Sequence, residues 1–372
     1  MGQLRDEKTI SSPVRVGLII YGSLDTLSGG YLYDRTLVEY LRRHGDQVEV
    51  ISLPWRNYVR HLGDNVSASL QRRLAASELD ILIQDELNHP SLFWLNRRLR
   101  ASVDCPFVSI VHHLRCSEPR PAWQNWFYGW IERHYLNSVD AFVFNSCTTR
   151  KEVASLTKAN QPHVVAYPGG DRLEPEISDQ GIVARANRAG PLRLFFLGNL
   201  TPRKGLHILI DALSELPRGG WHLSVAGGLS VDRAYSAHIM QQVNSYELTE
   251  QVHILGPLNE DEVGAQLEHS HLLVLPSLYE GFGIAYIEGM GYGLPAIATT
   301  AGAAHEIISH GENGYLVPPG ESHGLANCLK EILSDRKRLV EMGLKARQRY
   351  AAHPTWEQTA GRIREFLQGL LS

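Results

Sequence analysis

The chain has 372 residues, of which 43% are hydrophobic and 20% charged, and its formal net charge at pH 7 is -4. This length suffices for two domains with substantial cores, and the composition is ordinary for a globular protein. The charge balance gives no support for nucleic-acid binding. The four cysteines show no metal-ligand or redox spacing, so we expect free thiols in a reducing compartment.

The sequence predicts neither a membrane span nor a secretion signal. No apolar run reaches the roughly 18 residues needed to cross a bilayer. The first residues lack the apolar core of a signal peptide, and Asp6 stands where a myristoylation signal requires Ser or Thr. We therefore expect a cytoplasmic protein, with at most a peripheral contact at the inner face of a membrane.

The first part of the chain alternates short apolar runs with amphipathic segments. After the first run comes a loop with Gly29 and Gly30, and then a predicted helix over residues 34–44. This rhythm of strand, helix and strand indicates βαβ units and a parallel sheet. The predicted strands are residues 14–20, 47–53, 79–84, 107–111 and 141–144.

The rhythm stops after Gly170 and restarts at Leu192. Residues 171–191 are polar and aperiodic, as is typical of a connection between domains. The pattern predicts an α/β fold of two doubly wound, Rossmann-like domains, residues 1–170 and 192–352, that face each other across a ligand-binding cleft. The strands predicted for the second domain are residues 192–197, 221–226, 252–255, 272–275 and 295–298.

The segment from Tyr279 to Glu288 combines two carboxylates with a glycine-rich turn between a predicted strand and a helix. The free N–H groups and the dipole of a helix N-terminus favour an anion such as phosphate. The carboxylates of Glu280 and Glu288 would repel a phosphate and suit hydrogen bonds from hydroxyl groups instead. This combination favours a sugar attached to a nucleoside diphosphate.

A second candidate is the segment from Gly198 to Gly205, which leads from a predicted strand into a helix over residues 206–213. Arg203 and Lys204 are unfavourable at a helix start unless an anion compensates them, and both side chains suit a diphosphate. Two solvated loop cations are the alternative. Gly227, which follows a predicted strand, either lets a ligand approach the backbone or forms an ordinary turn.

His112 and His113 follow the predicted strand over residues 107–111. A histidine there would project into the cleft and bond a sugar hydroxyl or act near the reacting centre, and a structural role is the alternative. No accompanying spacing points to a metal site, and no D-x-D sequence, the usual carboxylate pair for a metal-bound nucleotide, occurs. The protein's own cations and helix ends would then neutralise a diphosphate.

Trp123, Trp126 and Trp130 have the spacing of one side of a helix. Burial in the core is the ordinary explanation, and a platform for an acceptor or a contact with a membrane surface is the alternative. Two basic clusters, residues 56–61 and 97–100, are interpreted as solvated helix faces.

The sequence from Glu280 to Glu288 resembles the E-x7-E motif of GT-B glycosyltransferases of family 4. The C-terminal part of the chain resembles this family over nearly its whole length. The N-terminal part is similar more loosely, through Gly29, Gly30, His112 and residues 145–146. Further segments follow in the family's usual order: residues 199–205, 256–257, 276–277, 293–295, Gly302 with Glu306, and 311–318.

The resemblance implies retaining transfer of a sugar from a nucleoside-diphosphate sugar to a glycan, lipid or small-molecule acceptor, without a metal or other cofactor. Glu288 would hold the ribose, Glu280 would lie near the donor sugar, and Lys204 would bind the diphosphate. The implied catalytic residues are His112, Arg203, Lys204 and Glu280. The implied donor-binding residues are Gly29, Gly30, Asn199, Arg203, Lys204, Gly227, Gly281, Phe282, Gly283, Ile284 and Glu288.

The resemblance also implies that the last helix, within residues 353–372, crosses back onto the N-terminal domain. One departure stands out, because Asn199 occupies a position where the family usually has arginine. A neutral amide cannot neutralise a diphosphate, and Arg203 is the candidate substitute. Two alternatives to sugar transfer stay open: a nucleotide-sugar epimerase on the same fold, and a non-catalytic subunit that binds nucleotide sugars.

Overall fold

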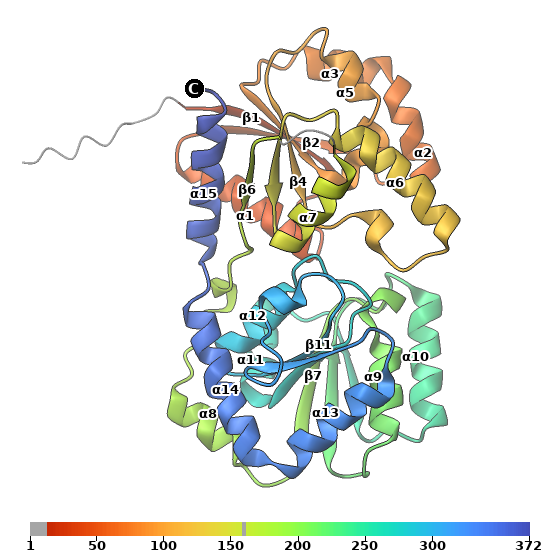
Figure 1. Cartoon of the computed structure of the whole chain (residues 1–372), viewed down its shortest axis with the longest axis vertical. Coiled ribbons are helices and arrows are strands. Elements are labelled where there is room, and N and C mark those ends of the chain that lie inside the picture. The colour runs from red at the N-terminus through yellow and green to blue at the C-terminus, as the bar shows by residue number, and fades with distance from the viewer. Residues whose placement is uncertain (1–12, 158–160) are drawn as a thin grey trace, which may run out of the picture.

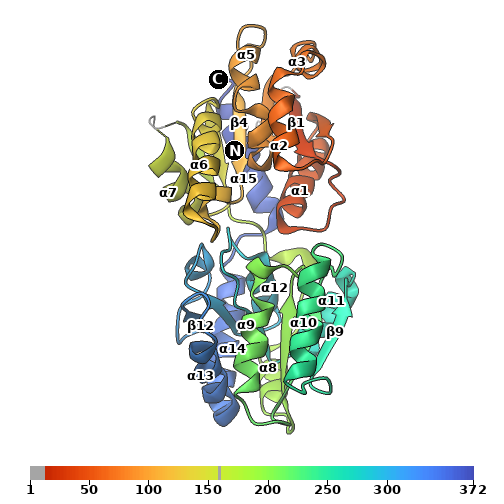
Figure 2. The same ribbon diagram turned by 90° about the vertical axis from the view of Figure 1, so that its right-hand side faces the viewer.

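The computed structural model describes residues 13–157 and 161–372. Each half of the chain builds a parallel six-stranded sheet between helices, and the two halves lie one above the other in Figures 1 and 2. The predicted fold class, two doubly wound α/β domains, is confirmed. The inner strands, such as β4 (Phe107–Val111) and β10 (Leu272–Leu275), are buried along their whole length because helices cover both faces of each sheet.

The first sheet has the order β2-β1-β3-β4-β5-β6, and every pair of neighbours is parallel. Two clusters of buried side chains, one on each face, form its core. Its strands are β1 (Arg15–Tyr21), β2 (Gln47–Leu53), β3 (Ile81–Asp85), β4 (Phe107–Val111), β5 (Ala141–Phe144) and β6 (His163–Val165). The helices of this half are α1 (Gly29–Arg43), α2 (Tyr58–Leu62), α3 (Ala68–Ala75), α4 (His89–Leu92), α5 (Leu95–Leu99), α6 (Ala122–Leu136) and α7 (Cys147–Leu156), with short 3-10 turns η1 (Gly63–Val66), η2 (Glu86–Asn88) and η3 (Arg115–Ser117).

The second sheet has the order β12-β11-β10-β7-β8-β9 and is also parallel. Its strands are β7 (Leu192–Leu197), β8 (Trp221–Ala226), β9 (Val252–Gly256), β10 (Leu272–Leu275), β11 (Ala296–Thr299) and β12 (Gly314–Val317). The helices are α8 (Asp179–Ala186), α9 (Leu206–Ser214), α10 (Arg233–Ser245), α11 (Glu260–His269), α12 (Ile284–Gly291), α13 (Ser322–Ser334) and α14 (Arg336–Ala351), with 3-10 turns η4 (Asp171–Leu173), η5 (Pro202–Lys204) and η6 (Ala304–Glu306). The chain ends in α15 (Trp356–Gly369).

The stretch expected to connect the domains contains a helix. Helix α8 packs against α14, and it buries Ile182 and Arg185. The Arg185 guanidinium donates hydrogen bonds to the carbonyl oxygens of Tyr292, at 2.7 Å, and Gly293, at 3.1 Å. Part of this stretch therefore packs into the C-terminal half and contributes a buried cation to it. The pattern of apolar residues does not reveal such a contact.

Helix α15 packs against α1 of the N-terminal half, as Figure 1 shows at the end of the blue ribbon. Trp356, Ile363 and Leu367 join the core between α1 and the first sheet. Arg364 pairs with the nearly buried Asp46 at 2.7 Å. The apolar side of the last helix is thus covered by the first half of the chain.

The interpretation of the three tryptophans of α6 as core residues is wrong. Trp123, Trp126 and Trp130 are 69%, 72% and 46% exposed. Helix α6 buries its other side instead, including Ile131 and Tyr135. Spacing predicts correctly that the tryptophans share one side, but it does not say which side of the helix meets the core. No helix in the described parts of the chain combines the length and apolar character needed to span a bilayer.

Candidate active site

A cavity of about 1190 Å³ lies between the two halves, where residues from both of them form its walls. Most strands of both sheets end toward it, as expected for ligand sites in parallel α/β sheets. The structure brings the whole predicted set of catalytic and donor-binding residues to this one cavity. Their individual roles stay predictions.

One charged pair at the cavity joins Lys204 and Glu280. The Lys204 Nζ donates to Oε1 of Glu280 at 2.5 Å, and the hydroxyl of Ser277 donates to the same oxygen at 2.7 Å. Burial alone would raise the pKa of Glu280, but Lys204 and Arg203 lower it to about 2. Burial lowers the pKa of Lys204, against the pull of Glu280. The pair places a fixed positive charge beside a carboxylate that stays ionised.

Arg203 lies beside this pair rather than pointing into bulk water. Its Nη1 donates to the carbonyl oxygen of Tyr279 at 2.8 Å and stands 3.6 Å from Oε1 of Glu280. Two cations therefore share one wall of the cavity. Asn199 does something else, because its amide bridges two backbone groups. The Oδ1 accepts from the N–H of Gly228 at 3.0 Å, and the Nδ2 donates to the carbonyl of Leu27 at 3.3 Å.

Glu288, the second carboxylate of the predicted motif, lies on α12 and is 3% exposed. The Nε of Arg172 donates to it at 2.8 Å, while Nη1 of the same guanidinium contacts Glu260 at 2.9 Å. Burial raises the pKa of Glu288, and Arg172 opposes that shift. One Glu288 oxygen has a cationic partner, and the carboxylate can accept hydroxyl donors from the cavity.

Two helices begin at the cavity. Helix α12 starts after Gly283, whose left-handed φ of 96° favours glycine, and no side chain caps it. Helix α1 starts at Gly29 and Gly30, with the hydroxyl of Ser28 accepting from the N–H of Tyr31. Neither first turn carries an acidic residue. The first N–H groups of each helix lack partners inside the helix and can bind an anion in the cavity.

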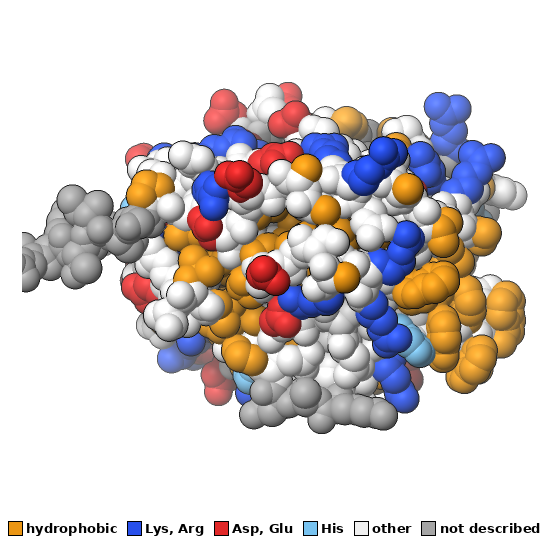
Figure 3. Space-filling view, turned by 90° about the horizontal axis from the view of Figure 1, so that it is seen from above, with side chains coloured by type: hydrophobic (Ala, Val, Ile, Leu, Met, Phe, Trp, Pro, Cys, Tyr) orange, Lys and Arg blue, Asp and Glu red, His pale blue; other side chains and the backbone are white. Residues whose placement is uncertain are grey.

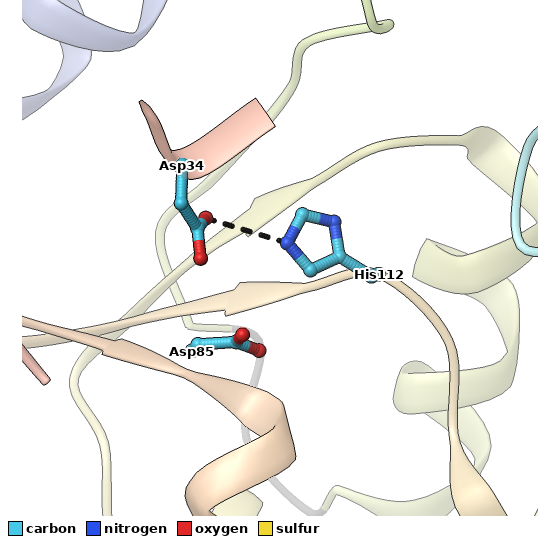
Figure 4. A group of neighbouring side chains, drawn as sticks. All are labelled: Asp34, Asp85 and His112. Carbon is cyan, nitrogen blue, oxygen red and sulfur yellow. Dashed lines mark hydrogen bonds and ion pairs between the residues drawn. The ribbon is translucent and has the colours of Figure 1, made fainter. Parts of the chain in front are cut away.

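His112 meets two aspartates in the N-terminal half. Its Nε2 is 3.4 Å from Oδ1 of Asp34, which is fully buried, and Asp85 lies at the end of the neighbouring strand (Figure 4). Burial would lower the pKa of His112, but the hydrogen bond and charge of Asp34, together with Asp85 and Glu86, raise it to about 8. Burial and Asp34 raise the pKa of Asp85. His112 is therefore mostly protonated at neutral pH and can donate to a ligand.

His113 also lines the cavity, and its ring contacts a carboxylate of the same half. Its Nε2 lies 3.0 Å from Oε1 of Glu118. Burial would raise the pKa of Glu118, but the hydrogen bond and charge of His113, with Arg120 and Arg203, lower it to about 2. Both histidines thus reach the cleft, and they differ in their carboxylate partners.

Two groups of side chains within the described residues could hold a metal ion. One is Asp34, Asp85 and His112, and the other is Glu86, His89 and Glu132, and within each group the ligand atoms lie within 4.8 Å of one another. In the first group the Asp34–His112 bond already uses one ligand atom of each residue. In the second, Glu132 accepts from the backbone N–H groups of Arg115 and Cys116. The expectation of metal-free chemistry stays a prediction.

The two halves touch through backbone and helix ends around the cavity. A Cβ atom at Gly281 would overlap the carbonyl oxygen of His112, so glycine permits this close approach. Glu306 of the C-terminal half accepts from the N–H groups of Cys147, at 3.0 Å, and Thr148, at 2.6 Å, at the start of α7. Burial would raise the pKa of Glu306, but these bonds and that of Tyr167 lower it.

Several residues of the site were not found from the sequence. Asp34, Glu118 and Arg172 belong to no motif. The partners of Asp34 and Arg172 are distant in the sequence and only the fold brings them near, whereas Glu118 pairs with His113 five positions earlier. Asp85 had a signal, because it directly follows a predicted strand and so falls at the carboxyl end of the sheet. Glu306 was noted only as part of the family's order, without its contact to α7.

The raised pKa of His112 gives a direct prediction. The imidazole of His112 should titrate with a midpoint near 8, and in Asp34→Asn the midpoint should fall toward the ordinary 6.5 because burial then meets less opposing charge. The stability linked to this proton is present below pH 6.5 and is lost as the pH rises through 8. Histidine NMR titration measures the midpoint, and an unchanged value in Asp34→Asn would refute the role of Asp34.

Two family profiles match the chain. The profile "Glycosyl transferase 4-like domain" matches residues 28–190, and the profile "Glycosyl transferases group 1" matches residues 182–349. A phosphatidyl-myo-inositol mannosyltransferase of Mycobacterium leprae is 25% identical over 376 residues, covering 94% of this chain and 95% of that protein. The glycogen synthase of Mycobacterium tuberculosis is 26% identical over 266 residues, and this chain spans only 61% of its length.

Solved structures resemble the whole chain. Sucrose-phosphate synthase from Thermosynechococcus elongatus superposes with a TM-score of 0.82 at 22% identity, covering 96% of this chain and 99% of that one. Alr3699/HepE from Anabaena, solved in complex with UDP and glucose, gives a TM-score of 0.75 at 21% identity, covering 95% and 99%. At such identities the likeness shows the fold, and it agrees with the two facing sheets.

Proposed function

The chain belongs to the GT-B glycosyltransferases of family 4, and we propose that it moves a sugar from a nucleoside-diphosphate sugar to an acceptor, with retention of configuration and without a metal ion. The observation that carries this proposal is the meeting of Lys204, Arg203 and the N-terminus of α12 at one cavity, opposite His112. These groups offer positive charge for a diphosphate and donors for a sugar. Glu288 adds an acceptor for ribose hydroxyls.

In the proposed reaction the bond between the anomeric carbon and the diphosphate oxygen breaks as the acceptor oxygen bonds to the same face of that carbon. The proton of the acceptor hydroxyl passes to the leaving phosphate. Negative charge grows on the diphosphate, and fixed donors that need no rearrangement stabilise that charge best. Lys204, Arg203 and the N–H groups at the starts of α1 and α12 are these donors. His112, mostly protonated at neutral pH, donates to a hydroxyl of the donor sugar.

The acceptor, a glycan, a lipid or a small molecule, would enter from the N-terminal side of the cavity. Trp55, Tyr58 and Arg115 line that side, away from the donor residues of the C-terminal half. Aromatic rings and a guanidinium suit sugar rings and acidic headgroups alike. The proposal includes a peripheral contact with a membrane, and the expected cytoplasmic location stays a prediction.

Calorimetry and product analysis test the proposal together. UDP, GDP and ADP, and their sugar conjugates, should be titrated into the protein, and the anomeric configuration of any product should be read by NMR. Binding of one nucleotide with transfer to an acceptor and retained configuration is expected. An inverted product would contradict retention, epimerised donor without transfer would favour an epimerase, and binding without turnover across an acceptor panel would favour a non-catalytic subunit.

Glu288→Gln should weaken nucleotide binding by about 10- to 100-fold, the worth of hydrogen bonds to a charged group. The exposed Glu260→Gln is a matched control, because Glu260 also contacts Arg172 but is 59% exposed. This control should bind the nucleotide within about twofold of the parent. Calorimetric Kd values decide, and equal losses in both variants would mean that Arg172, not the Glu288 carboxylate, carries the effect.

A further inference from the structure

We propose that one face of the N-terminal half docks on a lipid bilayer with anionic headgroups and presents the acceptor side of the cleft to lipid-anchored acceptors. This aromatic–basic face is formed by α2, η1, α4, α5 and α6. The statement about the acceptor rests on the proposed function, whereas docking itself does not. The apolar side chains of the face are Trp55, Val59, Val66, Trp94, Trp123, Trp126 and Trp130.

The tryptophans of the chain are divided unevenly between its surface and its core. Of seven tryptophans, the two outside this face, Trp221 and Trp356, are buried. Those of the face are exposed, with Trp126 at 72% and Trp55 at 64%. Exposed large aromatic side chains are costly in water unless something covers them, and tryptophan is enriched at the level of lipid headgroups.

The fold holds these rings outward. Trp123, Trp126 and Trp130 recur at helical spacing on α6, whose other side is buried. Helix α6 packs against α4, which packs against α2, so the three helices form a continuous surface. The ring of Trp130 contacts Phe93 at 6.1 Å. The packed helices beneath the apolar patch therefore hold its side chains in place at the surface.

The charge of the same face is positive, although the whole chain carries a net charge of -4. Residues 54–75, 88–100 and 121–137 hold only two carboxylates, Asp64 and Glu132, and both are buried. Asp64 pairs with Arg56 at 3.0 Å. Figure 3 shows hydrophobic side chains gathered at the edge where α2 and α6 lie, with Lys and Arg bordering them. The exposed arginines of the face are Arg56, Arg60, Arg97 and Arg133.

This combination favours an anionic bilayer over a protein partner. Arg60, Arg97 and Arg133 have no carboxylate within ion-pair distance among the described residues, so their charges are available to a surface of uniform negative charge. Arginine and tryptophan without exposed acids are what anionic headgroups attract and retain. The face also borders the cleft, since Trp55 and Tyr58 line the cavity. An acceptor with a lipid anchor could reach the cavity from the bilayer.

Vesicle binding tests the docking. The full chain should sediment with vesicles of mixed phosphatidylglycerol and phosphatidylcholine, and its tryptophan emission should shift to the blue. Pure phosphatidylcholine should bind it much less, and raised salt should weaken binding to the anionic vesicles. A variant with Trp94→Ser, Trp123→Ser and Trp126→Ser should lose both the sedimentation and the blue shift. Its matched control is Met240→Ser on α10, because Met240 is also exposed.

Charge reversal tests the basic part of the face. Each of Arg60→Glu, Arg97→Glu and Arg133→Glu should lower the partition coefficient on anionic vesicles by about fivefold or more, and Arg233→Glu on α10 should leave it unchanged. Equal binding of parent and variants, or equal binding to neutral and anionic vesicles, would overturn the proposal. So would size-exclusion data in which the tryptophan variant abolishes a dimer or a protein complex instead.

The same variants separate this proposal from the proposed function. Donor hydrolysis measured without vesicles should be unchanged in the tryptophan and arginine variants, because none of these side chains lines the cavity. Transfer to a lipid acceptor in anionic vesicles should fall with binding. If no variant or parent turns over any donor, the proposed function fails while the vesicle result still stands.

Discussion

Replacing Lys204 by methionine is expected to lower the rate of sugar transfer by about 100- to 1000-fold, the usual cost of removing a donor aimed at growing transition-state charge. Methionine keeps much of the apolar stem and removes the ammonium. Nucleotide affinity should fall as well, since in the proposed reaction the ammonium also binds the diphosphate of the ground state. Steady-state kcat with the identified donor, and calorimetric Kd for its nucleotide, measure the two effects.

Folding must be separated from catalysis in this variant. Lys204→Met leaves the Glu280 carboxylate buried with Arg203 at 3.6 Å, which should cost about 3 kcal/mol of unfolding free energy. Ser277→Ala removes another hydrogen bond to the same carboxylate and keeps the ammonium, so it controls for a weakened Glu280 environment. It should keep kcat within a few-fold. If Ser277→Ala lost as much activity as Lys204→Met, the charge of Lys204 would not explain the loss.

The fold was predictable because apolar runs and glycine breaks set the strand positions directly. The runs at residues 107–111 and 272–275 became β4 and β10, whose neighbours are all parallel. Helix α8 was missed because its buried side is small and includes a charged residue, Arg185, beside Ile182 and Ala186. The tryptophans of α6 were misplaced because periodicity gives the relative direction of side chains and not the direction of the core.

The sequence predicted single residues of the site but not how they pair with one another. His112, Lys204 and Glu288 were identified singly, and their partners Asp34, Glu280 and Arg172 come from elements whose meeting depends on the sheet order. Of these three pairs, only Lys204–Glu280 had both members on the predicted list. Asn199 was recognised as a departure from the family. Its structural role, bridging Gly228 and Leu27, lies in the contact between the halves and could not be derived from one position.

Gly281→Ala should lower the rate of transfer by about 100-fold, because a displacement of about 1 Å between reacting groups has that cost. The added methyl group would overlap the carbonyl oxygen of His112, and it also meets the Cβ of His113. The amide of Asn145 holds that carbonyl at 2.8 Å, so the oxygen cannot easily turn away. Because Gly281 has no left-handed φ, alanine fits its own backbone, and the strain arises across the halves.

Gly281→Ala and Lys204→Met should differ in their effect on nucleotide binding. Lys204, Glu280 and Glu288 all belong to the C-terminal half, so Gly281→Ala should leave the nucleotide Kd within a few-fold while kcat falls. Gly369→Ala is the control, since open space surrounds that glycine in the C-terminal helix. X-ray scattering should show a slightly wider separation of the halves in Gly281→Ala alone. An unchanged kcat would mean that the contact of Gly281 with His112 does not set the distance between donor and acceptor. A lower kcat together with weaker nucleotide binding would instead place the damage in the donor site itself.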